Sequence, residues 1–186
     1  RTAELEYRQA SGIKKTMSRF RTIEFLAASS APTQQEIRAI EEAVSASLPK
    51  DFKLFLHYAN GATLPYALYV ATDEVRASLS FESVLEAYDG YEDSMLVEIA
   101  AARARWPIPR QVLPFARDSG RSFACLDLRP ESYGAVVALL DPRDYQLGHL
   151  KEPPFVQVAP SFLDYVDRLV PEFSAAAFGT DEDDEP

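Results

Sequence analysis

The sequence predicts an α+β domain in which a mainly antiparallel sheet is flanked by N-terminal helices and one C-terminal helix. Apolar residues recur at helical spacing through most of the first half of the chain. Four short segments rich in apolar and β-branched residues, separated by turn residues, follow in the second half. Helices followed by a cluster of strands are typical of α+β domains. The 186 residues, 47% of them hydrophobic, suffice for one domain with a buried core.

Residues 1–32 are interpreted as an N-terminal extension that holds one helix and a linker. The helix is predicted over 13–27 from the helical spacing of Ile13, Met17 and Phe20, and the segment AASSAP that follows is interpreted as the linker. Met17 is one candidate for the natural start, in which case residues 1–16 were added during cloning. A fragment trimmed at its N-terminus is the alternative.

A single domain is expected over 33–172, and it begins with a capped helix. Thr33 and Glu36 have the spacing of a capping box, in which each side chain bonds a backbone N–H that the first helical turn leaves free. The helix is expected to end before Pro49. Its apolar stripe consists of Ile37, Ile40 and Val44.

The stretch LPKDFKLFLHYANG, residues 48–61, contains a second helix with both ends marked. Pro49 suits the first turn, and Gly61, which follows Asn60, suits a left-handed C-terminal cap. His57 lies off the apolar stripe and has no acid or nucleophile beside it in the sequence. We therefore interpret His57 as a structural or exposed residue. The stripe expected to be buried consists of Phe52, Phe55, Leu56 and Ala59.

The middle of the chain is expected to contribute one strand and two further helices. Residues 63–70 (TLPYALYV) predict the strand, and 94–106 predict a helix that is stopped by the prolines after it. Between them, another helical stripe is formed by Phe81, Val84, Leu85 and Tyr88. Acidic residues fall on another side of that helix, unless Gly90 ends it early and leaves Glu92 and Asp93 in a loop.

The second half is expected to supply most of the sheet. Strands are predicted at 112–115, 122–128, 135–141 and 155–158. Ser161 then caps a last helix that ends near Pro171. The core residues of this helix are predicted to be Phe162, Tyr165, Val166 and Leu169. Residues 173–186 form an acidic tail that is expected to be disordered.

Motifs for catalysis or cofactor binding are missing from the sequence. It contains no phosphate-binding glycine loop, no H-E-x-x-H and no G-x-S-x-G, and its two histidines are far apart. The lone Cys125 excludes an internal disulfide and a multi-cysteine zinc site, and its apolar strand favours a buried, inert thiol over a Cys–His nucleophile. The many carboxylates leave a glycosidase-like acid pair open, but no spacing singles one out. We expect no catalytic residue, metal or cofactor.

Charge gives the clearest indication of a partner. The net charge is −10, and the five acids of the tail account for half of it. Such a surface repels nucleic acid and attracts cationic partners. No Lys or Arg occurs between Ser80 and Glu98, so this segment is either a solvated acidic face or a docking surface for a basic partner. No apolar run approaches the ~20 residues of a membrane helix, and we expect a soluble, cytoplasmic protein.

Several motifs occur in an order that resembles the SUKH superfamily, in the branch named for the yeast Smi/Knr cell-wall synthesis regulators. The resemblance covers roughly 33–169. In chain order the motifs are Leu48-Pro49-Lys50-Asp51-Phe52, Phe55-Leu56, Asn60-Gly61, Leu113-Pro114-Phe115-Ala116, Asp118-Ser119-Gly120, Cys125-Leu126-Asp127-Leu128, 136–141 and Ala159-Pro160-Ser161-Phe162. One departure is Ser119-Gly120-Arg121, where the family often has a run of glycines, and it puts in doubt any interaction carried over for that loop.

The resemblance implies a domain without catalysis. Bacterial members are commonly immunity proteins that bind and neutralise a cognate toxin, often a nuclease or a nucleic-acid deaminase, and here a basic toxin would suit the charge. A regulatory scaffold, as in the fungal branch, and an unrecognised hydrolase that uses His149 or Asp127 are the alternatives. No nucleic acid or membrane partner is expected, and the oligomeric state stays open. The residues expected to bind the partner are Glu82, Glu86, Tyr88, Asp89, Tyr91, Glu92, Asp93, Asp118 and Glu131.

Overall fold

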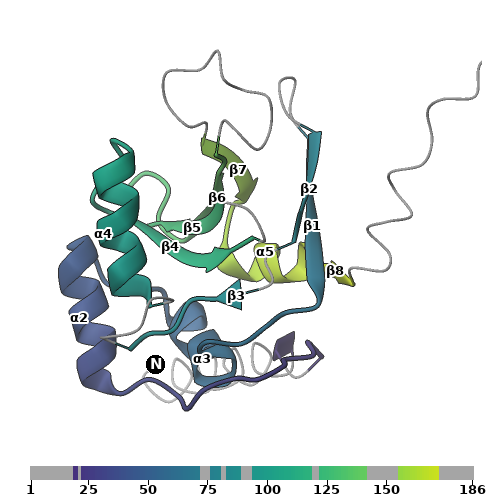
Figure 1. Cartoon of the computed structure of the whole chain (residues 1–186), viewed down its shortest axis with the longest axis horizontal. Coiled ribbons are helices and arrows are strands. Elements are labelled where there is room, and N and C mark those ends of the chain that lie inside the picture. Colours follow the sequence, from purple (N-terminus) through teal and green to yellow (C-terminus); the bar gives the residue numbers. More distant parts are fainter. Residues whose placement is uncertain are drawn as a thin grey trace, which may run out of the picture.

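The computed structural model describes residues 19–20, 22–71, 76–80, 83–88, 94–118, 122–141 and 155–171 (Figure 1). Within these residues the fold is α+β, as predicted. The helices are α2 (Gln34–Val44), α3 (Lys50–Ala59), α4 (Met95–Arg105) and α5 (Phe162–Arg168). The strands are β1 (Tyr66–Ala71), β2 (Arg76–Ser80), β3 (Ser83–Val84), β4 (Val112–Arg117), β5 (Phe123–Asp127), β6 (Ala135–Leu139), β7 (Phe155–Ala159) and β8 (Val170–Pro171).

Two antiparallel sheets organise the domain. The larger sheet has the order β3-β4-β5-β6-β7, so the four strands predicted in the second half of the chain lie side by side in sequence order. The smaller sheet has the order β2-β1-β8. Neither β2 nor β8 was predicted; β8 has only two residues and depends on its pairing with β1. The sequence therefore predicted four of the five strands of the larger sheet, all but β3, and one strand of the smaller sheet.

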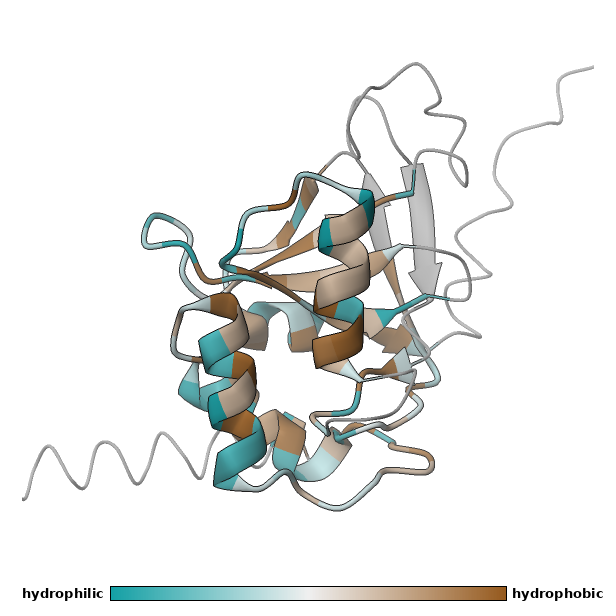
Figure 2. Ribbon diagram, turned by 60° about the vertical axis from the view of Figure 1, so that its left-hand side comes forward, coloured by the Kyte–Doolittle hydropathy of each residue, from teal (hydrophilic) through white to brown (hydrophobic). Residues whose placement is uncertain are grey.

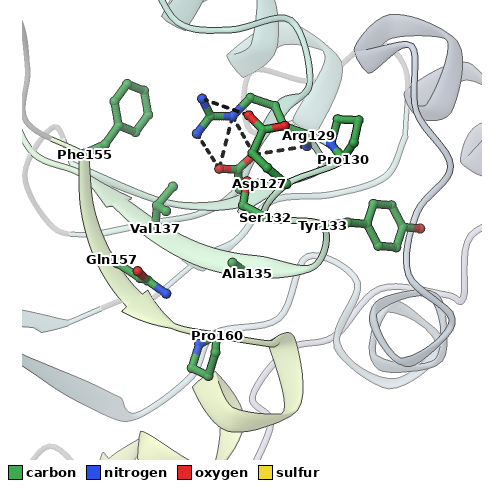
Figure 3. Close-up of a pocket in the computed structure, with 11 residues that line it drawn as sticks. Asp127, Arg129, Pro130, Ser132, Tyr133, Ala135, Val137, Phe155, Gln157 and Pro160 are labelled. Atoms are coloured by element: carbon green, nitrogen blue, oxygen red, sulfur yellow. Dashed lines mark hydrogen bonds and ion pairs between the residues drawn. The ribbon is translucent and has the colours of Figure 1, made fainter.

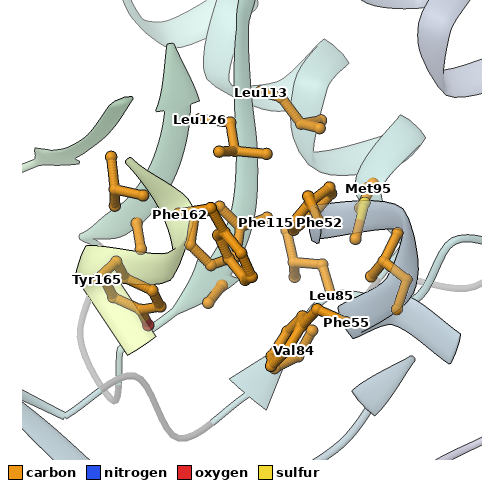
Figure 4. Close-up of a cluster of buried hydrophobic side chains, with 14 of the residues drawn as sticks. Phe52, Phe55, Val84, Leu85, Met95, Leu113, Phe115, Leu126, Phe162 and Tyr165 are labelled. Carbon is orange, nitrogen blue, oxygen red and sulfur yellow. The ribbon is translucent and has the colours of Figure 1, made fainter. Parts of the chain in front are cut away.

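Aromatic rings fill the core between the inner face of the larger sheet and helices α3 and α5 (Figure 4). Phe162 lies at the centre, with its ring centroid 4.9 Å from that of Phe55 and 5.0 Å from that of Phe52. Both contacts are edge-to-face, the arrangement that the ring quadrupole favours. Phe115 and Tyr165 join the cluster at 5.4 Å from each other, and both are fully buried. The apolar stripes predicted for α3 and α5 thus meet one another.

A second apolar cluster covers part of the outer face of the same sheet. Alternate residues of the strands turn to this side, where the end of α4 and the segment after it pack on them. In Figure 2 the strands of this sheet are mostly brown, whereas α2 carries hydrophilic bands. Cys125 belongs to the cluster and is fully buried, and burial raises the pKa of its thiol, which agrees with an inert cysteine. The cluster comprises Ala102, Ile108, Val112, Phe123, Cys125, Val137 and Leu139, with Trp106 packed against it.

The helix ends follow the sequence signals closely. The Thr33 hydroxyl accepts the Glu36 N–H at 3.3 Å, and the Glu36 carboxylate accepts the Thr33 N–H at 2.6 Å, so the capping box is confirmed. Pro49 is the N-cap of α3, and Gly61 has a φ of 64° just beyond the end of the helix. A Cβ at Gly61 would approach the Ser29 hydroxyl oxygen to 3.2 Å, so glycine suits the site for space as well as for φ.

The first predicted helix, 13–27, is wrong at its C-terminal end. Helical backbone is found at 19–20, whereas Leu26 forms an isolated antiparallel bridge with Thr63, with N···O distances of 3.0 and 2.8 Å in the two directions. Phe25 packs edge-to-face on Phe55 with centroids 6.0 Å apart. These two long-range contacts keep 25–26 extended. Of the predicted helix, residues 13–18 and 21 lie outside the described part.

The helix predicted from 81 onward is also wrong over its described part. Ser83–Val84 form β3, which pairs with the end of β4. The Val84 N–H donates to the Ala62 carbonyl at 2.9 Å, and the Leu85 N–H donates to the Phe115 carbonyl at 2.8 Å. Val84 and Leu85 therefore have backbone partners on both sides and are buried in an extended conformation. These long-range contacts outweigh the helical spacing of the apolar residues. Residues 81–82 and 89–93, together with the acidic tail, lie outside the described residues.

Candidate partner-binding surface

Asn60 fixes the segment that carries the first predicted contact residues. Its side chain is only 4% exposed. The Nδ2 atom donates to the Ser30 carbonyl at 2.9 Å, and the Oδ1 atom accepts the Ala87 N–H at 2.7 Å. The end of α3 is thereby tied to both the N-terminal linker and the segment 86–88. Because those two bonds join separate segments of the chain, the Asn-Gly pair identified in the sequence has a structural role.

Glu86 is held against the start of α4. Its carbonyl accepts the Met95 N–H at 2.9 Å, and Glu86 and Ser94 form an isolated bridge. Ser94 is fully buried and its hydroxyl caps α4 by accepting the Val97 N–H at 3.2 Å. The side chain of Glu86 lies over the bare Cα of Gly61. This bridge therefore joins the described segments on either side of residues 89–93.

A hollow of about 290 Å³ lies between the start of α2, the segment 86–88 and the start of α4. Its lining residues are Thr33, Gln35, Glu36, Ala39, Ala87 and Leu96. Tyr88, next to this lining, is 46% exposed, and Val97, next to Leu96, is 42% exposed. These residues, together with Glu86, are called the α2–α4 surface below. Its charged members are Glu36 and Glu86, so it combines apolar contact area with negative charge.

The other predicted contact residues do not join this surface. Asp118 closes the connection between β4 and β5, where its Oδ1 atom accepts the Ser122 N–H at 3.0 Å. Glu131 lies in the turn between β5 and β6, beyond the opposite end of β5, with 66% of its side chain exposed. The structure thus brings together Glu86 and Tyr88 and places Asp118 and Glu131 elsewhere. Glu82, Asp89, Tyr91, Glu92 and Asp93 lie outside the described residues.

Glu131 lines a second and larger hollow, of about 640 Å³, on the outer face of β6 and β7 (Figure 3). It is called the β6–β7 hollow below. Asp127, at the end of β5, is held there by Arg129, whose Nε and Nη2 atoms donate to Oδ1 and Oδ2 at 3.0 and 2.7 Å. Sequence reasoning missed this hollow, because its walls come from the β5–β6 turn and from β7, which are far apart in the chain.

The ion pair between Asp127 and Arg129 keeps two of the charged groups of the β6–β7 hollow ionised. Burial alone would raise the pKa of Asp127, but the hydrogen bonds and positive charge of Arg129 outweigh it and lower the pKa below its usual value. The same hydrogen bonding raises the pKa of Arg129. Both groups stay ionised at neutral pH, and together they carry no net charge. The exposed carboxylate of Glu131, 3.8 Å from the Arg129 Nη1 atom, supplies the remaining charge.

Within the described residues, no three His, Cys, Asp or Glu side chains come together as metal ligands. None of the helices described is long and apolar enough to cross a membrane. His57 is exposed on α3, as one of the two sequence interpretations held. His149, suggested for the hydrolase alternative, lies outside the described residues.

Comparison with known families identifies the family to which the chain belongs. The model of the SMI1 / KNR4 family (SUKH-1) matches residues 31–168, from just before α2 to the end of α5. The chain belongs to this family. The resemblance seen in the motifs is thereby confirmed, and members of the SMI1/KNR4 family are generally non-enzymatic. Comparison with the curated proteins gave no match.

Proposed function

We propose that this SMI1/KNR4 protein is an immunity protein that binds a cognate antibacterial toxin and neutralises it. The toxin is a basic nuclease or nucleic-acid deaminase, and the encounter takes place in the cytoplasm. Family membership supports a binding domain. The acidity of the chain, with a net charge of −10, supports a basic partner, because complementary potentials raise the association rate and favour the right partner.

The observation that carries the proposal is the run of acids in the sequence on either side of Tyr88, an exposed aromatic residue. Counting Glu98, six acidic residues and no basic one follow Ser80 in the segment 81–98. Glu98 bonds Arg117 at 3.2 Å, and the other five are Glu82, Glu86, Asp89, Glu92 and Asp93. The bridge between Glu86 and Ser94 joins the described segments on either side of the last three. We therefore place the toxin on the α2–α4 surface.

Binding there would combine two contributions. Tyr88 offers a large exposed ring on the same segment as Glu86, and aromatic side chains are frequent anchors of protein interfaces. The surrounding carboxylates would steer a basic toxin towards this ring over a distance set by the ionic strength. A toxin that cleaves or edits nucleic acid has a basic cleft for its substrate. An acidic protein lying over that cleft would block substrate access.

The experiment first asks whether the reading frame immediately upstream of the gene encodes a toxin-like protein, and then pairs the two proteins. Co-expression should rescue growth, and the two proteins should elute as one complex. Glu86→Lys together with Tyr88→Ala should abolish rescue, whereas Glu42→Lys, the same charge reversal at an exposed position of α2, should leave rescue intact. A toxin that stays lethal beside the folded wild-type protein, with no complex, contradicts the proposal.

A regulatory scaffold of the cell-wall type is the second candidate, because the matched family also carries the name of those regulators. It would use the same kind of surface for another partner. Affinity capture from the source cells separates the two functions. Recovery of cell-wall or signalling proteins, and no toxin, favours the scaffold.

A further inference from the structure

The β6–β7 hollow has the size and lining of a binding site. Its volume of about 640 Å³ lies within the range of sites that hold small ligands or single side chains of a partner. The floor consists of the small apolar residues Ala135 and Val137. Phe155, 41% exposed, stands at one end in Figure 3, and Tyr133, 50% exposed, stands at the other. Two of the five large exposed apolar side chains in the described part therefore flank one cavity.

The hollow begins where the outer apolar cluster stops. Ala102, Ile108 and Trp106 pack on the outer face of the sheet in the cluster that contains Val112 of β4 and ends at β6. Val137 is shared, because it belongs to that cluster and also to the floor of the hollow. On β7 the side chains turned to this face, Phe155 and Gln157, are exposed. The open part of the face thus continues an apolar layer.

Tyr133 is held in place at its end of the hollow. Its hydroxyl donates to the Ser47 carbonyl at 2.8 Å, which fixes the ring beside the β5–β6 turn while leaving half of it exposed. The same turn carries Glu131. Glu131 therefore adds an exposed carboxylate to a hollow with an apolar floor, a combination that suits a cation on an apolar stem.

Among the described lining residues, the charge disfavours an anion. Arg129, the one basic residue among them, already donates to Asp127 from two nitrogens, and its third nitrogen, Nη1, faces Glu131 at 3.8 Å. Asp127, Arg129 and Glu131 together carry a charge of −1. A phosphate or carboxylate would have to compete with both of these carboxylates for the same guanidinium.

We propose that the β6–β7 hollow receives an arginine side chain from an extended segment of a basic protein partner. The methylene stem of the arginine lies over Ala135 and Val137, and its guanidinium meets the carboxylate of Glu131. Phe155 covers the neighbouring apolar residue of the segment. This site is separate from the α2–α4 surface and does not require that the partner be a toxin.

The test uses the full chain and short synthetic peptides as probes. A fluorescein-labelled peptide that alternates arginine with valine is compared with one in which every arginine is citrulline, a neutral analogue of nearly the same shape. Anisotropy titrations at low salt should show that the arginine peptide binds about threefold more tightly, the size expected for an exposed ion pair. Amide shifts in NMR spectra should cluster on the β5–β6 turn and β7.

Matched variants assign the binding to the hollow. Glu131→Gln should weaken the arginine peptide by about twofold to fivefold and leave the citrulline peptide unchanged. Glu42→Gln, the same change on α2, should alter neither. Phe155→Ala should weaken both peptides, because it removes apolar contact area. All three positions are exposed, and far-ultraviolet circular dichroism should confirm that each variant is folded.

Three outcomes would overturn the inference: equal affinity for both peptides, equal effects of Glu131→Gln and Glu42→Gln, or amide shifts that cluster away from β7. Tighter binding of a glutamate-containing peptide would also overturn it, because it would assign the hollow to an anion. Since the probe is a peptide, failure of toxin neutralisation does not affect this result, and failure here leaves the α2–α4 surface untouched.

Discussion

Replacing Asn60 by alanine tests whether one buried amide holds the α2–α4 surface in place. The substitution removes the acceptor of the Ala87 N–H at 2.7 Å and the donor to the Ser30 carbonyl at 2.9 Å. Ala87 is 3% exposed, so its N–H would be left without a partner away from water, at a cost of about 1–3 kcal/mol. Ser30 is exposed and water can replace the lost bond, which adds about 1 kcal/mol at most.

The free energy of unfolding should therefore fall by about 1–4 kcal/mol. Urea denaturation followed by circular dichroism measures it, and the slope with urea should stay unchanged because the core is intact. In native-state hydrogen exchange, the Ala87 amide should lose protection beyond the global loss. A change below about 0.5 kcal/mol, or an Ala87 amide as protected as before, would refute the structural role assigned to Asn60.

Three further predictions concern the rest of the fold. Phe162→Ala should cost about 3–5 kcal/mol in urea denaturation, because it empties the centre of the aromatic cluster, and a loss below about 1 kcal/mol would contradict that packing. Thr33→Ala should cost about 1 kcal/mol by breaking the capping box, and an unchanged midpoint would speak against the cap. Asp127 has a lowered pKa in the folded state, so its stabilising pairing with Arg129 is complete above its unfolded pKa of about 3.9 and is lost as the pH falls through the folded value. Asp127→Asn should therefore lower stability at neutral pH and flatten its decline below about pH 4, and an unaltered pH profile would disprove the linkage.

The sequence predicted those elements whose signals are local. The capping box at Thr33, the proline that precedes α3 and the serine cap of α5 each determine a helix end within a few residues. The four strands β4–β7 were recognised because apolar runs and turn residues mark them in the chain. These features need no knowledge of the partner element, so one sequence is enough to find them.

The failures occurred where distant contacts decide the conformation. Leu26 is extended because it pairs with Thr63, and Val84 and Leu85 are extended because Ala62 and Phe115 accept their N–H groups. Apolar residues a few positions apart suit a helix as well as a short strand buried on both sides, so the spacing alone could not separate the two.

The candidate surfaces show the same division. Glu86 and Tyr88 were selected as candidate contact residues because negative charge accumulates along one segment of the chain. The β6–β7 hollow was missed, because Tyr133 and Phe155 become neighbours of one cavity only after β6 and β7 pair. Glu131 was selected as an exposed loop acid, and the structure gives it a setting that the sequence did not reveal.

The salt dependence of toxin binding tests the central claim most directly. Surface plasmon resonance should follow association of the wild type, the Glu86→Lys variant and the Glu42→Lys control with the toxin, over salt from about 50 to 500 mM. We predict that the wild type and the control associate quickly at low salt and about tenfold or more slowly at high salt, and that Glu86→Lys associates slowly throughout. Association that is independent of salt, or that responds equally to both charge reversals, would contradict an acidic docking surface built around Glu86.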